Sequence, residues 1–263
     1  TGAAGERGIG RAIALRLARD GAAVVVNDVT DAPRGDWGGL PAVVAEIEAM
    51  GTGALGFVGS ISDASNVQGL VAAAVEHFGR LDILVNNAGA PAGEDRRTIV
   101  DLAESEWSRV HEVNAKGTFL MCQAGARHMI DRGGGGRIIN ISSLAGRVGI
   151  ARYGAYCASK FAIVGLTQVL ALELGEHNIT VNAICPGLTD TERLSGMASG
   201  LKPEGTTTEE YRQELIGQNE ALTPLGRIAQ PQDVAQAAAF LSSDEASFVT
   251  GQSVNVSGGA WMG

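Results

Sequence analysis

The sequence predicts a single α/β domain, spanning residues 1–263, built on a doubly wound parallel sheet. Two observations predict this fold. Short apolar, β-rich runs alternate with helical patterns, and a glycine-rich turn leads directly into the first helical pattern. Of the 263 residues, 45% are hydrophobic and only 5% are aromatic, so the core must be aliphatic. Aliphatic runs suit strands that are buried on both faces.

Turn-forming residues separate the expected elements. Ile9, Ile13 and Leu17 recur at helical spacing after the first glycines, and residues 110–120 show a second amphipathic pattern. The four consecutive glycines at 133–136 are too flexible to extend a helix and should form the turn into the next strand. Strands are expected at residues 23–27, 81–86, 137–142, 179–184 and 253–256.

The start of the chain and two polar segments depart from this alternation. A glycine-rich turn of this kind ordinarily follows a strand, and none precedes Thr1. We therefore expect the first, central strand to be missing, which would leave unpaired strand edges and an open apolar slot. Residues 30–41 are predicted to form an extended loop, and residues 190–222 a mobile substrate lid within the single domain.

The composition disfavours several classes of protein. The formal net charge of −9 argues against a nucleic-acid partner, which needs clustered Lys and Arg. Three cysteines lack CxxC spacing and four histidines show no ligand pattern, so we expect a reduced interior without a metal. No signal peptide is visible, and polar residues interrupt the longest apolar stretch, 161–172, before the ~20 residues of a membrane span. A cytoplasmic protein with no membrane partner is expected.

The segment Thr1–Gly10, TGAAGERGIG, has the composition of a phosphate-binding turn. It opens a helix, so backbone N–H groups and the positive end of the helix dipole would face a pyrophosphate. Glycine is needed because a Cβ would hold the phosphate away. Arg7 could reach the same group. The turn alone is weak support, since a glycine-rich turn can be purely structural.

Asp28 follows the expected strand 23–27 and lies eighteen positions after Gly10. This is close to the ~20-residue spacing at which a carboxylate can bond the adenosine ribose hydroxyls. The same carboxylate would repel a 2′-phosphate, so we predict NAD as the cofactor and consider NADP less favoured. Arg34, in the following loop, could fold back and offset that repulsion.

Tyr156 and Lys160, in the segment YCASK, are four residues apart on a predicted helix and share one face. An unperturbed tyrosine has a pKa of ~10, which is too high for a base near neutrality. A nearby ammonium stabilises the phenolate, so this pair can support proton transfer. The YxxxK pattern is weak by itself, because it also arises on solvated helix faces.

Six ordered segments together resemble the short-chain dehydrogenase/reductase family, over nearly the whole chain. The glycine-rich turn is similar to the TGxxxGxG motif of the family. Asn86–Gly89 matches its NNAG motif, and Tyr156 and Lys160 match its YxxxK motif. The other matching positions are Ser143, thirteen residues before the tyrosine, the helix residue Asn114, and the PGxxxT segment 186–191.

The resemblance implies a Rossmann fold and hydride transfer between NAD(H) and a secondary alcohol or ketone. Tyr156 would be the acid or base, Ser143 would bond the substrate oxygen, and Lys160 would lower the tyrosine pKa and hold the nicotinamide ribose. Asn114 would kink its helix and hold a water through its main chain. The resemblance also suggests a homotetramer or homodimer, with helices near 105–130 and 155–176 at the interface. The expected cofactor-binding residues are Gly2, Arg7, Gly8, Ile9, Gly10, Asp28, Ser60, Ile61, Asn87, Ala88, Gly89, Tyr156, Lys160, Pro186, Gly187, Leu188, Thr189 and Thr191.

The sequence departs from the family pattern in two places. Five residues, instead of three, separate Gly2 from Gly8, so the turn should bulge at Glu6 and Arg7. Where the family often has an adenine-binding Asp, this chain has Ser60, which is a weaker acceptor.

Other functions remain as alternatives. A cofactor-binding regulatory protein of the same fold would lack the tyrosine or the lysine, and an epimerase or dehydratase would need a larger C-terminal region. The substrate is open among an oxoacyl thioester, a sugar or polyol, a steroid-like alcohol and a small ketone. Arg147 or Arg152, before the catalytic tyrosine, could meet an anionic substrate.

Overall fold

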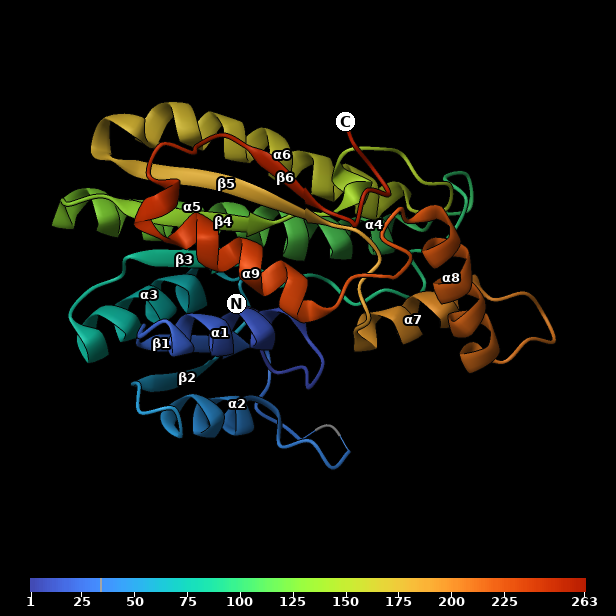
Figure 1. The fold of residues 1–263 in the computed structure, drawn as a ribbon, viewed down its shortest axis with the longest axis horizontal. Helices are drawn as coiled ribbons and strands as arrows, with labels where there is room; N and C mark the ends of the chain where they lie inside the picture. Colours follow the sequence, from blue (N-terminus) through green and yellow to red (C-terminus); the bar gives the residue numbers. More distant parts are fainter. Residues whose placement is uncertain (34) are drawn as a thin grey trace.

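Parallel strands form the centre of the molecule, and helices cover them (Figure 1). The structure is a computed structural model that describes residues 1–33 and 35–263. Arg34, considered above as a partner for a 2′-phosphate, lies outside the described residues. The strands are β1 (Val24–Asp28), β2 (Ala54–Val58), β3 (Ile83–Asn86), β4 (Gly136–Ile141), β5 (Ile179–Pro186) and β6 (Ser253–Val256).

Local chemistry determines where several helices begin and end. At the start of α3 (Ala64–Phe78) the Asp63 side chain accepts hydrogen bonds from the backbone N–H groups of Ser65 and Asn66, and at its end Gly79 adopts a φ of +78°. The α-helices are α1 (Ile9–Arg19), α2 (Gly39–Glu48), α3 (Ala64–Phe78), α4 (Glu104–His111), α5 (Thr118–Arg132), α6 (Gly154–Leu174), α7 (Glu192–Leu201), α8 (Thr208–Leu222) and α9 (Pro231–Ser242). A π-helical segment, η1 (Glu112–Gly117), joins α4 to α5, and short 3₁₀ turns occur at η2 (Leu144–Gly146), η3 (Gly175–His177) and η4 (Asp244–Ala246).

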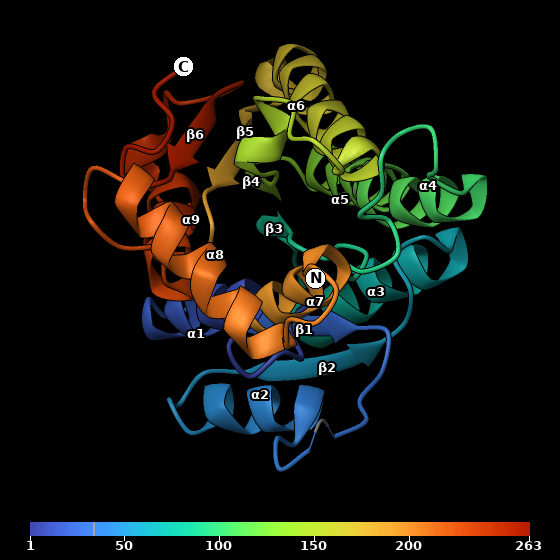
Figure 2. The ribbon, with the colours of Figure 1, turned by 90° about the vertical axis from the view of Figure 1, so that its right-hand side faces the viewer.

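The two faces of the sheet carry separate cores. Successive strand residues point to opposite faces. Ile138 accordingly packs with residues of α3, α5 and α6, and Ile139 packs with residues of α1 and α9. Figure 2 shows these two helix layers on either side of the strands. The sheet therefore has the two-sided cover that its aliphatic strands predict.

The strands form two hydrogen-bonded groups, β1-β2 and β3-β4-β5-β6. Between β1 and β3 lies an apolar cavity of about 460 Å³, whose lining includes residues 24–27 and 83–85. The first residues of the chain bridge its carboxyl end, where Thr1 N donates to Val85 O and Ala3 N donates to Asn27 O. The expected apolar slot is thus present between these two strands.

The expected strands all form, with ends within about two residues, as is usual for assigned boundaries. The strand β2 was not predicted from the sequence, because its ALGFV segment has an interior glycine and alternating exposed residues. Part of the expected loop 30–41 belongs to α2, which begins at Gly39. The glycine run behaves as expected, because Gly133 to Gly135 have positive φ and β4 begins at Gly136.

The helix expected near residues 155–176 is present as the helical stretch Gly154–His177. It has a mean hydropathy of 1.5 over a membrane-length window, and 39% of that window is buried inside the protein. A helix in the core of a water-soluble domain can be equally long and equally apolar. Its partners are protein elements, since it packs on β5 and η2, so its hydropathy does not indicate a membrane protein.

Candidate active site

The glycine-rich turn is closed by a hydrogen bond from Gly8 N to Gly5 O, 3.2 Å long, and α1 begins at Ile9. Gly10 is packed so closely that an added Cβ would lie 2.3 Å from Gly2 O and 2.6 Å from Asn87 Nδ2. No real side chain fits there, which explains why this position needs glycine. The inserted residues Glu6 and Arg7 form an exposed turn beside the start of α1.

The loop after β3 is tied to this turn. Asn87 Nδ2 donates to the carbonyl oxygens of Thr1 and Gly2, and the backbone N–H groups of Asn87 and Ala88 donate to Thr1 Oγ1. Gly2 has a φ of +66° and faces Ala88 so closely that its Cβ would lie 2.6 Å from the Ala88 Cα. The two motifs therefore form one rigid unit, with Gly89 next in the chain.

Asp28 ends β1 next to the same turn. Its Oδ2 accepts a hydrogen bond from Ala4 N at 3.0 Å, and its Oδ1 accepts one from Val29 N at 2.8 Å. The carboxylate is thus held at the carboxyl end of the strand, where parallel α/β sheets bind ligands. Among residues expected at the adenine end, Ser60 pairs with the Ser62 hydroxyl at 2.8 Å. Ile61 is 4% exposed and packs against Gly117, so its side chain belongs to the core.

The segment after β5 lies beside the glycine-rich turn. Gly187 N donates to Val256 O, and Leu188 O accepts from Ala229 N, which fixes the chain after Pro186. Thr189 and Thr191 are buried, and Thr191 immediately precedes α7. The next residue, Glu192, accepts a hydrogen bond from Arg7 N at 2.8 Å. The structure therefore gathers the ends of β1, β3 and β5 at one edge of the molecule.

Tyr156 and Lys160 lie on the first turns of α6, and Ser143 follows β4. Lys160 Nζ is 5.8 Å from the centroid of the Tyr156 ring and donates to Ile141 O at 2.7 Å. The Ser143 hydroxyl acts as a hydrogen-bonding neighbour of the Tyr156 phenol and lowers its pKa. Ser143 Oγ also accepts from Ala145 N at 3.1 Å, which orients the hydroxyl. A phenol, a serine hydroxyl and an ammonium thus converge.

Competing effects act on the pKa of Tyr156. Burial is the largest and raises the pKa, because it disfavours the charged phenolate. The positive charges of Arg193 and Lys160, the Ser143 hydrogen bond and the charge of Arg96 together outweigh burial, and the pKa lies below its usual value of 10. Burial likewise lowers the pKa of Lys160, and the phenol partly opposes that shift. The surroundings favour a tyrosine that can lose its proton.

Asn114 is fully buried within the π-helix η1. Its Oδ1 accepts from Ala90 N at 2.8 Å, and its Nδ2 donates to Ser159 Oγ at 2.9 Å. The side chain therefore joins the loop after β3 to α6, three residues after Tyr156. A π-helical turn has backbone groups outside the regular helix pattern, which agrees with the expected distortion at this residue.

Two arginines near Tyr156 were missed in the sequence. The guanidinium carbons of Arg96 and Arg193 lie 4.9 Å and 5.0 Å from the centroid of the Tyr156 ring. The two arginines considered for an anionic substrate serve the backbone instead. Arg147 donates to carbonyl oxygens of Ser253 and Gly263. The guanidinium of the other, Arg152, donates to the carbonyl oxygens of Arg96, Gly200 and Leu201.

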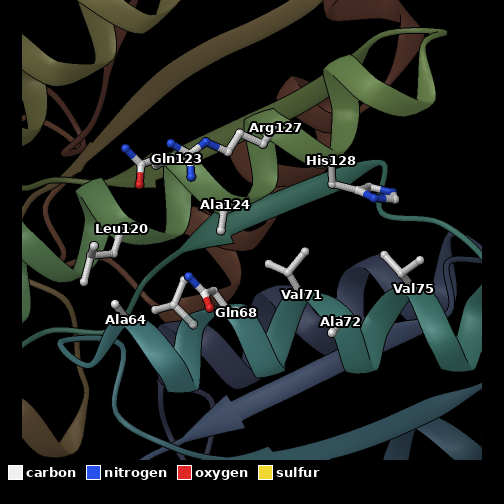
Figure 3. A pocket seen from close by; sticks show the side chains of 11 residues that line it. Ala64, Gln68, Val71, Ala72, Val75, Leu120, Gln123, Ala124, Arg127 and His128 are labelled. Carbon is white, nitrogen blue, oxygen red and sulfur yellow. The ribbon is translucent and has the colours of Figure 1, made fainter.

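A surface cavity of about 360 Å³ lies between α3 and α5, away from these groups (Figure 3). Its labelled lining is mostly aliphatic, with Gln68, Gln123, Arg127 and His128. The His128 ring nitrogen Nε2 already accepts from Leu81 N. Within residues 1–33 and 35–263, no three His, Cys, Asp or Glu side chains are grouped so that they could hold a metal ion.

Comparisons with known proteins identify the class. The family model described as enoyl-(acyl carrier protein) reductase matches residues 2–260. A short-chain dehydrogenase/reductase of Armillaria gallica is 40% identical over 96% of this chain and 92% of its own length. The sorbitol dehydrogenase of Cereibacter sphaeroides is 37% identical over 97% of this chain and 94% of its own. The crystal structure of levodione reductase superposes with a TM-score of 0.85 at 33% identity, covering 96% and 93% of the two chains.

The fold and these relatives define an oxidoreductase that transfers a hydride with a nicotinamide cofactor. Within that class, the chain belongs to the short-chain dehydrogenase/reductase family. The expectation of an α/β Rossmann fold is confirmed. Enzymes of this family act on small molecules and commonly form oligomers.

Proposed function

We propose that this protein interconverts a secondary alcohol and a ketone with NAD(H), and that Tyr156 is its acid and base. The observation that carries the proposal is the convergence of Tyr156, Ser143 and Lys160 beside the carboxyl ends of the strands. One phenol with a lowered pKa, one neutral donor and one ammonium are the groups that proton transfer to or from a carbinol oxygen requires.

The residues of the turn fit a dinucleotide. Gly8 and Gly10 flank the first residue of α1 without side chains, and a Cβ at Gly10 would meet the backbone. The bound cofactor would supply the hydride acceptor or donor. Holding it would fall to the glycine-rich turn, Asp28, the loop 87–89 and the segment 186–191. We expect Ser60 and Arg7 to contribute less, because Ser60 is paired with Ser62 and Arg7 is exposed.

We propose NAD as the preferred cofactor. Asp28 supports this choice, because its carboxylate is fixed at the end of β1 and would repel a 2′-phosphate. NADP is the alternative, since the position of Arg34 is not described.

The proton path follows from the contacts of these residues. In alcohol oxidation Ser143 holds the substrate oxygen while Tyr156 takes its proton. Lys160 stabilises the phenolate, and its bond to Ile141 O fixes the ammonium. The Asn114 side chain is occupied by Ala90 and Ser159, so a water relay would use its main-chain carbonyl.

We further propose that residues 190–222, which contain α7 and α8, act as the substrate lid, and that the enzyme is cytoplasmic. For assembly as a homotetramer or homodimer, α5 and α6 offer an apolar surface. Phe119 and Phe161 are 44% and 45% exposed, and Leu172 is 86% exposed. Exposed apolar groups of this size are typical of protein interfaces.

Replacing the tyrosine tests the proposal. We expect Tyr156→Phe to lose at least about 1,000-fold in kcat, because general acid–base catalysis contributes about 10²- to 10⁴-fold. NADH binding, followed by fluorescence, should stay nearly unchanged. The experiment is a screen of secondary alcohols with NAD and NADP separately. Substantial turnover by Tyr156→Phe would refute the acid–base role.

A non-catalytic regulatory protein of the same fold is the alternative function. It would bind NADH but turn over no alcohol in that screen. The intact Tyr156 and Lys160 argue against it.

A further inference from the structure

Three cationic side chains surround the Tyr156 ring, although the whole protein carries a net charge of −9. They are Arg96 at 4.9 Å, Arg193 at 5.0 Å and Lys160 at 5.8 Å from the ring centroid. Each is attracted to the aromatic face, but the three like charges repel one another in a partly buried site. This local excess of positive charge favours binding of an anion.

The protein supplies only partial compensation. Arg96 is fully buried and pairs through Nη1 with Asp95, and within residues 1–33 and 35–263 its Nε and Nη2 have no hydrogen-bond partner. Asp95 also faces Arg109 at 3.9 Å, and Arg109 has a closer carboxylate partner in Glu106 at 2.7 Å. Lys160 donates to a neutral carbonyl, Ile141 O, which does not offset its charge.

Arg193 is the cation with free donors. Within the part of the chain that the structure describes, it forms no ion pair with a carboxylate, and its guanidinium points toward Gly89 and the Tyr156 ring. The other nearby arginine, Arg152, bonds three backbone carbonyls. Arg193 therefore offers a planar donor group next to the proposed acid and base.

We propose that the substrate of this site is a short hydroxy acid or oxo acid, whose carboxylate is bound by Arg193 beside the unpartnered edge of Arg96. This inference rests on the proposed function and specifies its substrate class. A guanidinium donates two parallel N–H bonds to a carboxylate. Because Arg193 lies against the Tyr156 ring, the carboxylate and the reacting carbinol belong to the same short segment, as in a 2- or 3-hydroxy acid.

The reaction balances without a further reactant. The carbinol carbon of the hydroxy acid gives its hydride to the oxidised nicotinamide, and its hydroxyl proton goes to Tyr156. The products are the oxo acid and the reduced cofactor. The carboxylate keeps its charge throughout and serves only to bind and orient the substrate.

The test compares acids with their neutral esters. Oxidation of 2-hydroxybutyrate and 3-hydroxybutyrate is measured against that of their methyl esters, each as the racemate. We expect Arg193→Gln to lower kcat/KM for the better acid by about 10- to 100-fold, mainly through KM. Because the Arg193 charge also lowers the pKa of Tyr156, each variant is compared at a pH on the plateau of its own profile, where kcat/KM for the ester should change by less than about threefold. Arg193→Lys should regain part of the acid activity. The control is Arg19→Gln, at the exposed end of α1, which removes one positive charge far from Tyr156. It should leave kcat/KM unchanged for both the acid and the ester.

A binding experiment gives a second readout. Malonate should raise the Tm of the wild-type NADH complex but not that of the Arg193→Gln complex, and dimethyl malonate should raise neither. An equal loss of kcat/KM for the acid and for its ester in Arg193→Gln would overturn the inference. So would an NADH Kd raised about tenfold in Arg193→Gln, because Arg193 would then serve the cofactor. If neither acids nor esters nor neutral alcohols react, the proposed function fails, while the malonate result still decides on the anion site.

Discussion

Glu192 and Arg7 join the first residue of α7 to the glycine-rich turn, because the Glu192 carboxylate accepts a hydrogen bond from Arg7 N at 2.8 Å. The second carboxylate oxygen lies 3.0 Å from the place where a Cβ on Gly5 would be. Backbone N–H groups before a helix favour anions. The carboxylate thus occupies an N–H group of the turn that we propose for the cofactor pyrophosphate.

We expect Glu192→Gln to bind NADH about 3- to 10-fold more tightly, because an exposed like charge contributes modestly and is screened by salt. Fluorescence titration of NADH measures the Kd. Glu204→Gln, which removes an exposed charge on the loop between α7 and α8, is the matched control and should leave the Kd unchanged. The increase in NADH affinity of Glu192→Gln over the wild type should become smaller at 1 M NaCl, because salt screens the charge. An unchanged or weaker Kd would show that Glu192 does not compete with the cofactor.

Asp28→Ser should move the preference toward NADP. The ratio of kcat/KM for NADP to that for NAD should rise about tenfold or more, because a fixed carboxylate no longer faces the 2′-phosphate. Serine keeps a hydrogen-bond acceptor near Ala4 N, so the turn should persist. Initial rates with both cofactors measure the ratio, and Asp31→Ser, in the exposed loop, is the control. A wild-type enzyme that already favours NADP would contradict our view of Asp28.

Much of the fold follows from local patterns. The strands with uninterrupted β-branched runs are predictable, and so are the helix after the first glycines and the turn at 133–136. The strand β2 has an interior glycine and three partly or fully exposed side chains, so its pattern is weak. The helix near 155–176 was expected from the family resemblance and is present, although Gly165, Thr167 and Gln168 interrupt its apolar pattern in the sequence.

Some residues of the proposed site could be predicted from the sequence, and others could be found only in the folded structure. Tyr156, Lys160 and Ser143 stand at fixed separations in sequence, so the pattern could identify them. Arg96 lies in the loop after β3 and Arg193 in the first turn of α7, and only the folded chain brings them to the Tyr156 ring. From the sequence, Arg152 was a candidate for binding an anionic substrate. Its backbone partners on α7 could not be known without coordinates.

The lowered pKa of Tyr156 sets an expected pH dependence. Alcohol oxidation uses the phenolate, so kcat/KM should rise with pH and level off above a midpoint below 10. Ketone reduction uses the protonated phenol and should fall through the same midpoint. Lys160→Met removes one stabilising cation and should move the midpoint upward, as seen in pH profiles at saturating cofactor. A midpoint that does not move would mean that Lys160 does not act on the tyrosine pKa.

The buried pair Asp95 and Arg96 allows the roles in stability and catalysis to be separated. Both side chains are at most 1% exposed, and Asp95 also accepts a hydrogen bond from Gly93 N. Arg96→Met leaves a buried carboxylate without its close partner and should cost about 3–5 kcal/mol in the free energy of unfolding. Asp95→Asn combined with Arg96→Met removes both charges and keeps the acceptor for Gly93, so urea unfolding should show most of that loss recovered. Because Arg96 helps to lower the Tyr156 pKa, the double variant should still show a raised pH midpoint for oxidation. A double variant no more stable than Arg96→Met would mean that the arginine stabilises the fold through its packing on Tyr153 and Tyr156 rather than through its charge.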